Sequence, residues 1–141
     1  MKIIINEAPM SQSRPRFNSR TKRAYEKADI TNYKKRVGYA TKQVIKKPIE
    51  KGIALKIDVV FYMQTPKSVS NIKKNAVNLR NEVIRVTKKP DIDNLLKAIL
   101  DGLNGIAFDD DNQITDVTMK KRYSLTPRIE IDITEVGDSD V

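Results

Sequence analysis

The amino-acid sequence predicts a single α+β domain in which helices cover a mixed, mostly antiparallel sheet. Two observations support this prediction. Large apolar residues occupy every second position of 53–62, as in a half-buried strand. Across 29–44 apolar residues recur at steps of three and four, as on one face of a helix. The 141 residues are long enough for one such core, so we expect one domain over 1–141.

The first half of the chain predicts four elements. The segment 2–5 reads as a short buried strand, and 6–23 reads as a loop because it holds two prolines and five cations. The helix over 29–44 and the strand over 53–62 follow. Pro66 then begins a second, weaker helix that keeps helical spacing as far as Leu79.

The second half predicts an extended segment, a helix and two strands. Residues 82–87 read as extended. The helix over 93–103 has its leucines on one side and ends at Asn104 and Gly105. The segments 113–123 and 128–134 alternate again, and the turn between them predicts a hairpin. The order is therefore β-α-β-α-α-β-β, and we expect the tail 136–141 to fray.

Composition narrows the class of protein. A formal net charge of +9 and a pI near 9.7 favour a polyanionic partner. Cysteine is absent, which excludes disulfides and thiolate chemistry and fits a protein of a reducing cytoplasm. No apolar run approaches the roughly 20 residues of a membrane span, so we expect no membrane partner. With only 6% aromatic residues the core is thin, which favours a homodimer.

One segment runs against the basic charge. Residues 91–116 contain seven aspartates, no glutamate and a single cation, Lys97, so their balance is −6 and the rest of the chain carries +15. Crowded carboxylates repel one another and usually share a counterion. The candidates are a metal ion and the metal-bound phosphates of a nucleic acid.

The residue types select among metals. An EF-hand starting at Asp109 fails, because it would need glycine at Ile114 and glutamate at Lys120. Zinc is excluded because the chain has neither histidine nor cysteine. The remaining oxygen ligands suit magnesium, with manganese as the alternative. Another reading stays open for the first two aspartates, in which Asp93 or Asn94 caps a helix and Asp91 is a nearby surface charge.

A second cluster is basic. Residues 14–47 contain twelve Lys or Arg against two acidic residues. Within it Arg14, Arg16 and Phe17 combine cations with an aromatic ring, as suits contact with phosphates and insertion at a DNA junction. A solvated loop is the alternative reading.

These residues carry a resemblance to a known family. The stretch KKPDIDNLLKAILDGLNG at 88–105, followed by DDDNQITDVTMKKRY at 109–123, resembles the RusA family of Holliday junction resolvases. The family motif is Asp-x-Asp-Asn-Leu-x-Lys at a helix start and a later Asp-Asp-x-Gln. The Pro- and Arg-rich loop SRPRF also matches. The likeness is to members from Gram-positive bacteria and prophages, which implies a protein of the cytoplasm of a bacterium or a phage-infected cell.

The resemblance implies a homodimeric, magnesium-dependent endonuclease that nicks two opposed strands of a four-way DNA junction through metal-activated water. It implies Asp91, Asp93 and Asp111 as metal ligands, with Asp110 as the alternative to Asp111, and Lys97 as the catalytic lysine. A catalytically silent DNA-binding module is the alternative function. The residues expected to contact DNA are Arg14, Arg16, Phe17, Arg20, Lys22, Arg23, Lys89 and Lys120.

Overall fold

The fold is built on a sheet of four strands: β1 (Lys2–Ile5), β4 (Leu55–Gln64), β5 (Ile114–Ser124) and β6 (Arg128–Glu135). The computed structural model describes residues 1–12, 16–21, 23–25 and 27–137. The strands lie in the order β1-β6-β4-β5. β6 is antiparallel to β1 and β4, whereas β4 and β5 are parallel. The prediction of a mixed, mostly antiparallel sheet within an α+β fold is therefore confirmed.

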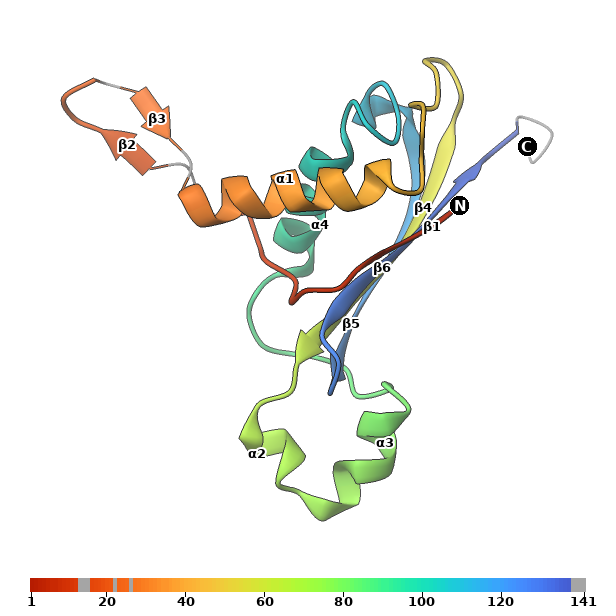
Figure 1. Ribbon diagram of the computed structural model, residues 1–141. Helices are drawn as coiled ribbons and strands as arrows, with labels where there is room; N and C mark the ends of the chain where they lie inside the picture. Colours follow the sequence, from red (N-terminus) through yellow and green to blue (C-terminus); the bar gives the residue numbers. More distant parts are fainter. Residues whose placement is uncertain (13–15, 22, 26, 138–141) are drawn as a thin grey trace.

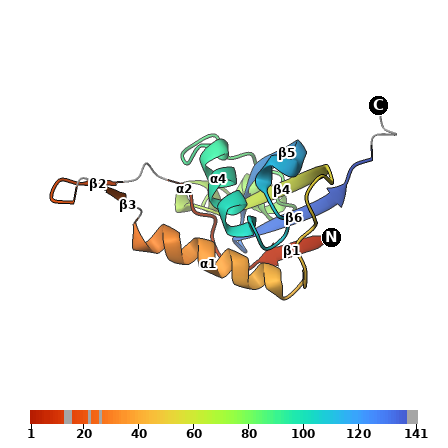
Figure 2. The ribbon, with the colours of Figure 1, turned by 90° about the horizontal axis from the view of Figure 1, so that it is seen from above.

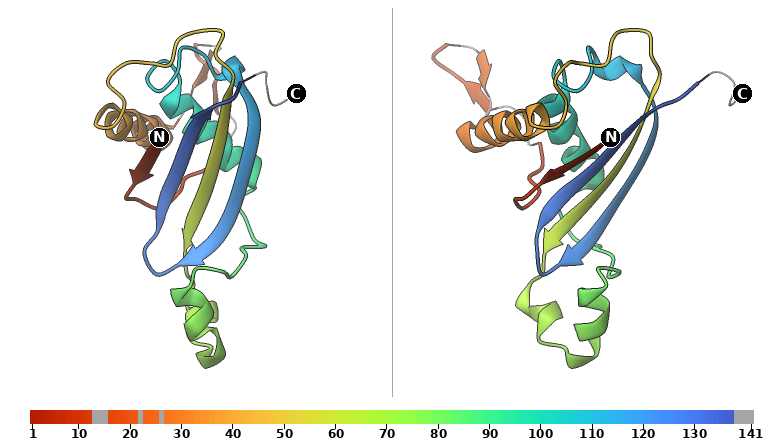
Figure 3. Two further views of the ribbon diagram at one scale, coloured as in Figure 1. Left: turned by 90° about the vertical axis from the view of Figure 1, so that its right-hand side faces the viewer. Right: turned by 45° about the vertical axis from the view of Figure 1, so that its right-hand side comes forward.

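Two helices, α1 (Ala28–Lys42) and α4 (Ile92–Leu103), cover one face of this sheet, and the opposite face carries no helix (Figures 1 and 3). The core lies between these two layers. It forms because every second residue of β4 and β6 points toward the apolar stripes of the helices. Its largest fully buried side chains are Tyr33, Phe61, Phe108, Ile3, Leu55, Ile57, Leu95, Ile99, Leu103, Ile129, Ile131 and Val37.

Glycine allows α1 and α4 to approach closely. A Cβ atom on Gly102 would lie 2.7 Å from Cγ1 of Val37 and 3.1 Å from the main-chain oxygen of Lys34. A Cβ atom on Gly38 would lie 2.7 Å from Cδ1 of Ile106. Any larger residue at either position would push the helices apart, so the position of α4 over the sheet depends on both glycines.

The basic segment predicted as a loop contains a small hairpin. β2 (Arg16–Asn18) pairs antiparallel with β3 (Arg23–Tyr25). Asn18 organises the turn, because its side-chain oxygen accepts hydrogen bonds from the main-chain amides of Arg20 at 2.9 Å and Thr21 at 3.3 Å. The hairpin lies beyond the N-terminal end of α1 (Figure 2). The prediction of an unbroken loop was wrong because this local turn chemistry was overlooked.

The weaker helix predicted from Pro66 to Leu79 is broken. It consists of α2 (Lys67–Ser70), a 3-10 turn η1 (Lys73–Asn75) and α3 (Ala76–Arg80). The side chain of Asn75 donates a hydrogen bond to the main-chain oxygen of Val69 over 3.0 Å. A short amide side chain that takes a backbone acceptor in this way competes with the helical ladder.

The predicted hairpin between 113–123 and 128–134 is wrong, although both strands exist. β4 lies between β5 and β6 in the sheet. β4 buries Leu55, Ile57, Val59 and Phe61, so it gains most from a central position between two partners. β5 is mostly exposed and forms an edge of the sheet.

The segment predicted as extended, 82–87, forms no named strand but lies along the outer edge of β5. Arg85 forms an isolated bridge with Arg122, and the amide of Tyr123 donates to the oxygen of Ile84 over 2.9 Å. At the tail, the amide of Val136 donates to the oxygen of Ala54, so fraying does not begin there. Residues 138–141 lie outside the described residues. No helix in the described part of the chain is long and apolar enough to cross a membrane.

Candidate active site

The first two aspartates of the motif lie where α4 begins. Asp91 is the N-cap residue, with extended backbone at φ −67° and ψ 140°, and its main-chain oxygen accepts the first helical hydrogen bond from Leu95. Its carboxylate, however, makes no capping hydrogen bond. Asp93 lies in the first turn. Both side chains are exposed at the positive end of the helix dipole. The cap is thus neither Asp93 nor Asn94, and capping does not occupy the Asp91 carboxylate.

Asp91 and Asp93 line a groove of about 790 Å³ between the start of α4, the end of β5 and the segment that precedes the helix. Among the described residues, neither carboxylate takes part in a hydrogen bond or an ion pair. Cations dominate the rest of the lining. They are Arg85, Lys88, Lys89, Lys120, Lys121 and Arg122.

Lys121 links strand β5 to the segment that precedes α4. Its ammonium group donates hydrogen bonds to the main-chain oxygens of Lys88 and Pro90, each over 2.7 Å. Lys121 pairs in register with buried Phe61, so it points to the helix side of the sheet, and the alternating pleat turns Lys120 to the other side. The strand β5 therefore fixes the turn that delivers Asp91 to the start of α4.

Lys97 lies one turn beyond Asp93 on the same exposed face of α4. An ion pair with Asp93 or Asp101 would be the ordinary role for a lysine at this spacing. Asp101 instead pairs with Lys34 over 2.8 Å. Within the described part of the chain Lys97 has no ion-pair partner, which leaves its ammonium group available for a phosphate.

The second acidic cluster lies in a tight turn, η2 (Asp111–Gln113). Asp110 accepts a hydrogen bond from the amide of Asn112, and its own amide donates to the side-chain oxygen of Gln113 over 3.0 Å. Gln113 is buried and donates through its side-chain nitrogen to the oxygens of Glu50 at 2.8 Å and Ile53 at 3.1 Å. The glutamine of the motif thus anchors the acidic turn to the loop before β4.

Asp110 and Asp111 differ in their acidity. The main-chain amide of Asn112 lowers the pKa of Asp110. The pKa of Asp111 is raised, chiefly by its side-chain hydrogen bond with Asp110 and then by burial. The neighbouring charge of Asp101 acts in the same direction. The fold therefore stabilises the charged form of Asp110 and disfavours the charged form of Asp111.

The structure does not bring all four candidate carboxylates together in one copy of the chain. The amide of Asp111 donates to the side chain of Asn104, just beyond the carboxyl end of α4, whereas Asp91 and Asp93 lie at its amino end. Twelve helical residues separate these ends by about 18 Å. Accordingly, no three His, Cys, Asp or Glu side chains of the described residues lie close enough to hold one metal ion.

The expected DNA contacts fall into three groups. Lys89 and Lys120 line the groove beside Asp91 and Asp93. Arg20 lies in the turn of the β2–β3 hairpin and is exposed. Arg14 and Lys22, and the side chains of Arg16, Phe17 and Arg23, lie outside the described residues. Their role stays a prediction.

Sequence reasoning missed several groove residues. Lys88, Lys121 and Arg85 were not singled out, although Lys121 makes the contacts that hold the turn before α4. A signal was available, since 120–122 is a run of three cations inside a strand, where side chains alternate between faces. One of the three had to point toward the helices.

An acidic pair in a cationic groove is the arrangement of an enzyme that acts on a polyanion such as nucleic acid. Comparison with known proteins gives the family. The family model described as "Endodeoxyribonuclease RusA" matches residues 7–134. The chain therefore belongs to the RusA endodeoxyribonuclease family and is a nuclease, a hydrolase that acts on DNA. It is also 35% identical over 139 residues to "Uncharacterized protein YqaN" of Bacillus subtilis (strain 168), and the match covers 97% of each chain.

Proposed function

We propose that this chain is a divalent-metal-dependent Holliday junction resolvase whose metal is held by Asp91 and Asp93. Family membership supports the action on four-way junctions. The observation that carries the metal proposal is the Asp91 carboxylate, which occupies the N-cap position without capping the helix. Asp91 lies beside a second carboxylate, Asp93, and none of the described residues pairs directly with either, which favours a cation bound between them.

The donor set fits magnesium, with manganese as the alternative. Magnesium is commonly held by one or two carboxylates, with waters and substrate phosphates completing its shell. Asp91 and Asp93 supply that number of ligands, and both are exposed to solvent. When bound, such an ion lowers the pKa of a coordinated water and neutralises charge on the scissile phosphate.

The residues of the chain supply the remaining parts of the reaction. Lys89, beside Asp91, binds a phosphate that flanks the scissile bond and thereby orients the strand, while Lys120, on the other side of edge strand β5, contacts a phosphate farther along the DNA. Lys97 places its positive charge one turn along the helix from Asp93, where it stabilises the developing negative charge of the transition state. Lys121 keeps Asp91 in position through its bonds to the turn 88–90.

Asp111 enters this site from a second copy of the chain. Within one copy the length of α4, about 18 Å, separates the turn that holds Asp111 from the helix end that holds the first two ligands. Two α4 helices packed antiparallel across a two-fold axis would place the carboxyl end of each beside the amino end of the other. The apolar exposure of this region supports such packing, since Val117 on edge strand β5 is 43% exposed and Leu96 and Leu100 on α4 are only partly buried against the core.

The first experiment measures cleavage of a labelled four-way junction with and without magnesium. Asp91→Asn and Asp93→Asn should each abolish nicking and leave junction binding intact, because each removes ligand charge and no phosphate contact. Normal nicking by either variant would reject the metal site. Asp116→Asn, which removes an exposed carboxylate farther along β5, is the matched control and should cleave normally.

The shared site is tested by mixing two inactive variants. A dimer of one Asp93→Asn subunit and one Asp111→Asn subunit would contain one site with all three carboxylates. Since about half of randomly mixed dimers are of this kind, about a quarter of wild-type single-strand nicking should return. If all three ligands came from the same copy, both sites of every mixed dimer would be defective and the mixture would remain inactive.

A further inference from the structure

A helical appendage, defined here as residues 65–81, projects from the end of β4, away from α1 (Figures 1 and 3). It contains α2, η1 and α3. Most of its side chains are exposed, and only Leu79 is buried. Its charge has one sign, with four Lys or Arg and no Asp or Glu. The remaining polar side chains are mostly Asn and Ser. The four cations are Lys67, Lys73, Lys74 and Arg80.

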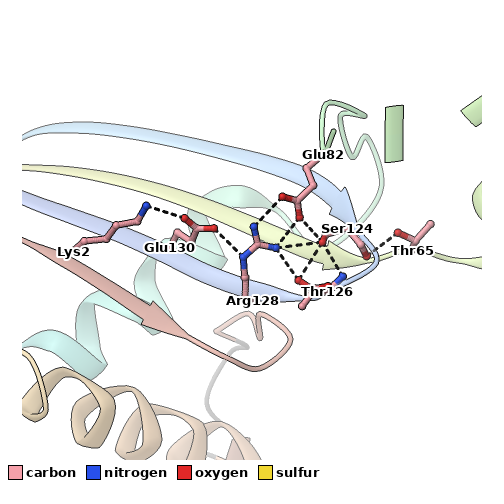
Figure 4. Close-up of polar contacts among 7 residues, drawn as sticks. All are labelled: Lys2, Thr65, Glu82, Ser124, Thr126, Arg128 and Glu130. Atoms are coloured by element: carbon pink, nitrogen blue, oxygen red, sulfur yellow. Dashed lines mark hydrogen bonds and ion pairs between the residues drawn. The ribbon is translucent and has the colours of Figure 1, made fainter. Parts of the chain in front are cut away.

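The appendage is fixed to the sheet at its base. Arg128 of β6 donates to both carboxylate oxygens of Glu82, at 2.6 and 2.8 Å, and to Glu130 at 2.8 Å (Figure 4). The same guanidinium lies 3.9 Å from the ring centroid of Tyr62. Ser124 donates to Glu82 over 2.5 Å. The acidic residue that follows the appendage is therefore fully engaged by Arg128, and leaves the appendage cations unneutralised.

Apolar contacts also fix the base of the appendage to the sheet. Leu79 of α3 packs with Val86 and Tyr123, and Val69 of α2 lies against this cluster. The hydroxyl of Thr65 donates to the main-chain oxygen of Ser124 over 2.8 Å. The cations of the appendage are thus presented in a defined direction from the sheet.

The positive surface is continuous with the candidate active site. Arg85, Lys88 and Lys89 lie between the appendage and Asp91, and all three line the active-site groove. A second hollow of about 340 Å³ adjoins it, and its lining includes Pro66 at the base of α2 together with Lys88 and Lys89. From 65 to 90 the chain holds seven Lys or Arg and one acidic residue, Glu82.

We propose that the helical appendage binds the phosphate backbone of a DNA duplex arm adjoining the site of cleavage. This inference rests on the proposed junction-resolving function. Charge complementarity selects the partner, since the appendage carries four cations and no acidic residue and adjoins a groove lined by three further cations, Arg85, Lys88 and Lys89. Asn and Ser side chains add neutral donors for phosphate oxygens, as in sequence-independent contacts. The exposed Ile72 and Val77 suit a protein partner, which is the competing occupant.

The test compares two variants with equal loss of charge. Lys73→Gln with Lys74→Gln removes two exposed cations from η1. The control, Lys2→Gln with Lys56→Gln, removes two solvent-facing cations from β1 and β4, outside both the basic cluster 14–47 and the active-site groove. Binding to a four-way junction is measured without metal over a range of salt concentrations. Each phosphate contact contributes about 0.9 to the slope of log K against log salt, so the appendage variant should lose up to about 1.8. The control should keep its slope, and Lys73→Arg with Lys74→Arg should restore it.

Each result decides the matter. An unchanged slope in the appendage variant, or an equal loss in the control, would overturn the inference. So would an altered oligomeric state with unchanged DNA binding, which would assign the surface to a protein. Failure of the wild-type chain to bind or nick a junction would reject the proposed function as well. Loss confined to the appendage variant supports the inference, provided that its melting temperature matches that of the wild type.

Discussion

The main-chain amide of Asp111 donates to the side-chain oxygen of Asn104 over 3.2 Å, just beyond the carboxyl end of α4. This contact ties the second acidic cluster to one end of the helix whose other end carries Asp91. The distance between the two acidic groups is therefore set by the length of α4. For that reason we propose that Asp111 reaches the metal site from a second copy of the chain, which agrees with the homodimer that the family resemblance implies.

Asp111→Asn should stabilise the metal-free protein near neutral pH. The pKa of Asp111 is raised in the fold, mainly by Asp110. A carboxylate of this kind destabilises the fold as pH rises through its unfolded value of about 3.9. In chelator the variant should melt above the wild type at pH 7, and the difference should vanish at pH 3.

Excess magnesium should reverse this order, because it binds the folded wild type and the variant lacks a ligand. Thermal melts of both proteins, with and without the metal, provide the measurement. Equal shifts in both proteins would show that Asp111 is no ligand.

Lys121→Met should reduce the rate of cleavage more than it reduces DNA binding. The substitution removes two 2.7 Å hydrogen bonds that hold the turn before Asp91. Loss of a group that orients a metal ligand commonly costs about 10- to 100-fold in activity. Single-turnover nicking at saturating junction measures this effect. A variant with normal turnover and weakened binding would make Lys121 a phosphate contact instead.

Gln113→Ala should destabilise the fold by about 1 to 3 kcal/mol, because it leaves two backbone oxygens and one amide, all partly buried, without their partner. Asn112→Ala is the matched control, since its side chain is exposed. Urea unfolding curves of the two variants compare the costs. Similar midpoints for both would reject the anchoring role assigned to Gln113.

Glu82→Gln should weaken the base of the appendage in a pH-dependent way. The hydrogen bonds from Arg128 lower the pKa of Glu82. Its stabilisation is therefore present above its unfolded pKa of about 4.3 and is lost as pH falls through the lowered value. We expect a cost of about 1 to 3 kcal/mol at pH 7.

Melting temperatures measured from pH 7 down to pH 3 test whether the stability contributed by Glu82 is lost in acid. The gap between the wild type and Glu82→Gln should close toward the acid end. The gap for Glu135→Gln, which changes an exposed carboxylate, should stay small throughout. A Glu82→Gln gap that widens in acid would contradict the lowered pKa.

The sequence predicted the elements whose evidence is local. The alternation across 53–62 matched β4, and the leucine pattern after Asp91 matched α4. Both could be predicted because the periods of a strand and a helix appear in the spacing of apolar residues that are close in sequence. The chemistry at Asp91 and Asp93 was recognisable for the same reason, since the motif is contiguous. The small hairpin β2–β3 and the break in the helix after Pro66 were missed, because single Asn side chains decide both.

The sequence by itself determined the residue types available for function: oxygen ligands without histidine or cysteine, a basic surface, and a motif shared with one nuclease family. Only the tertiary structure decided which of these residues lie together. β4 separates two strands that are consecutive in the chain, and α4 separates Asp111 from Asp91. Both outcomes depend on burial summed over the whole domain, because a strand takes the central position when it has most apolar surface to remove from water.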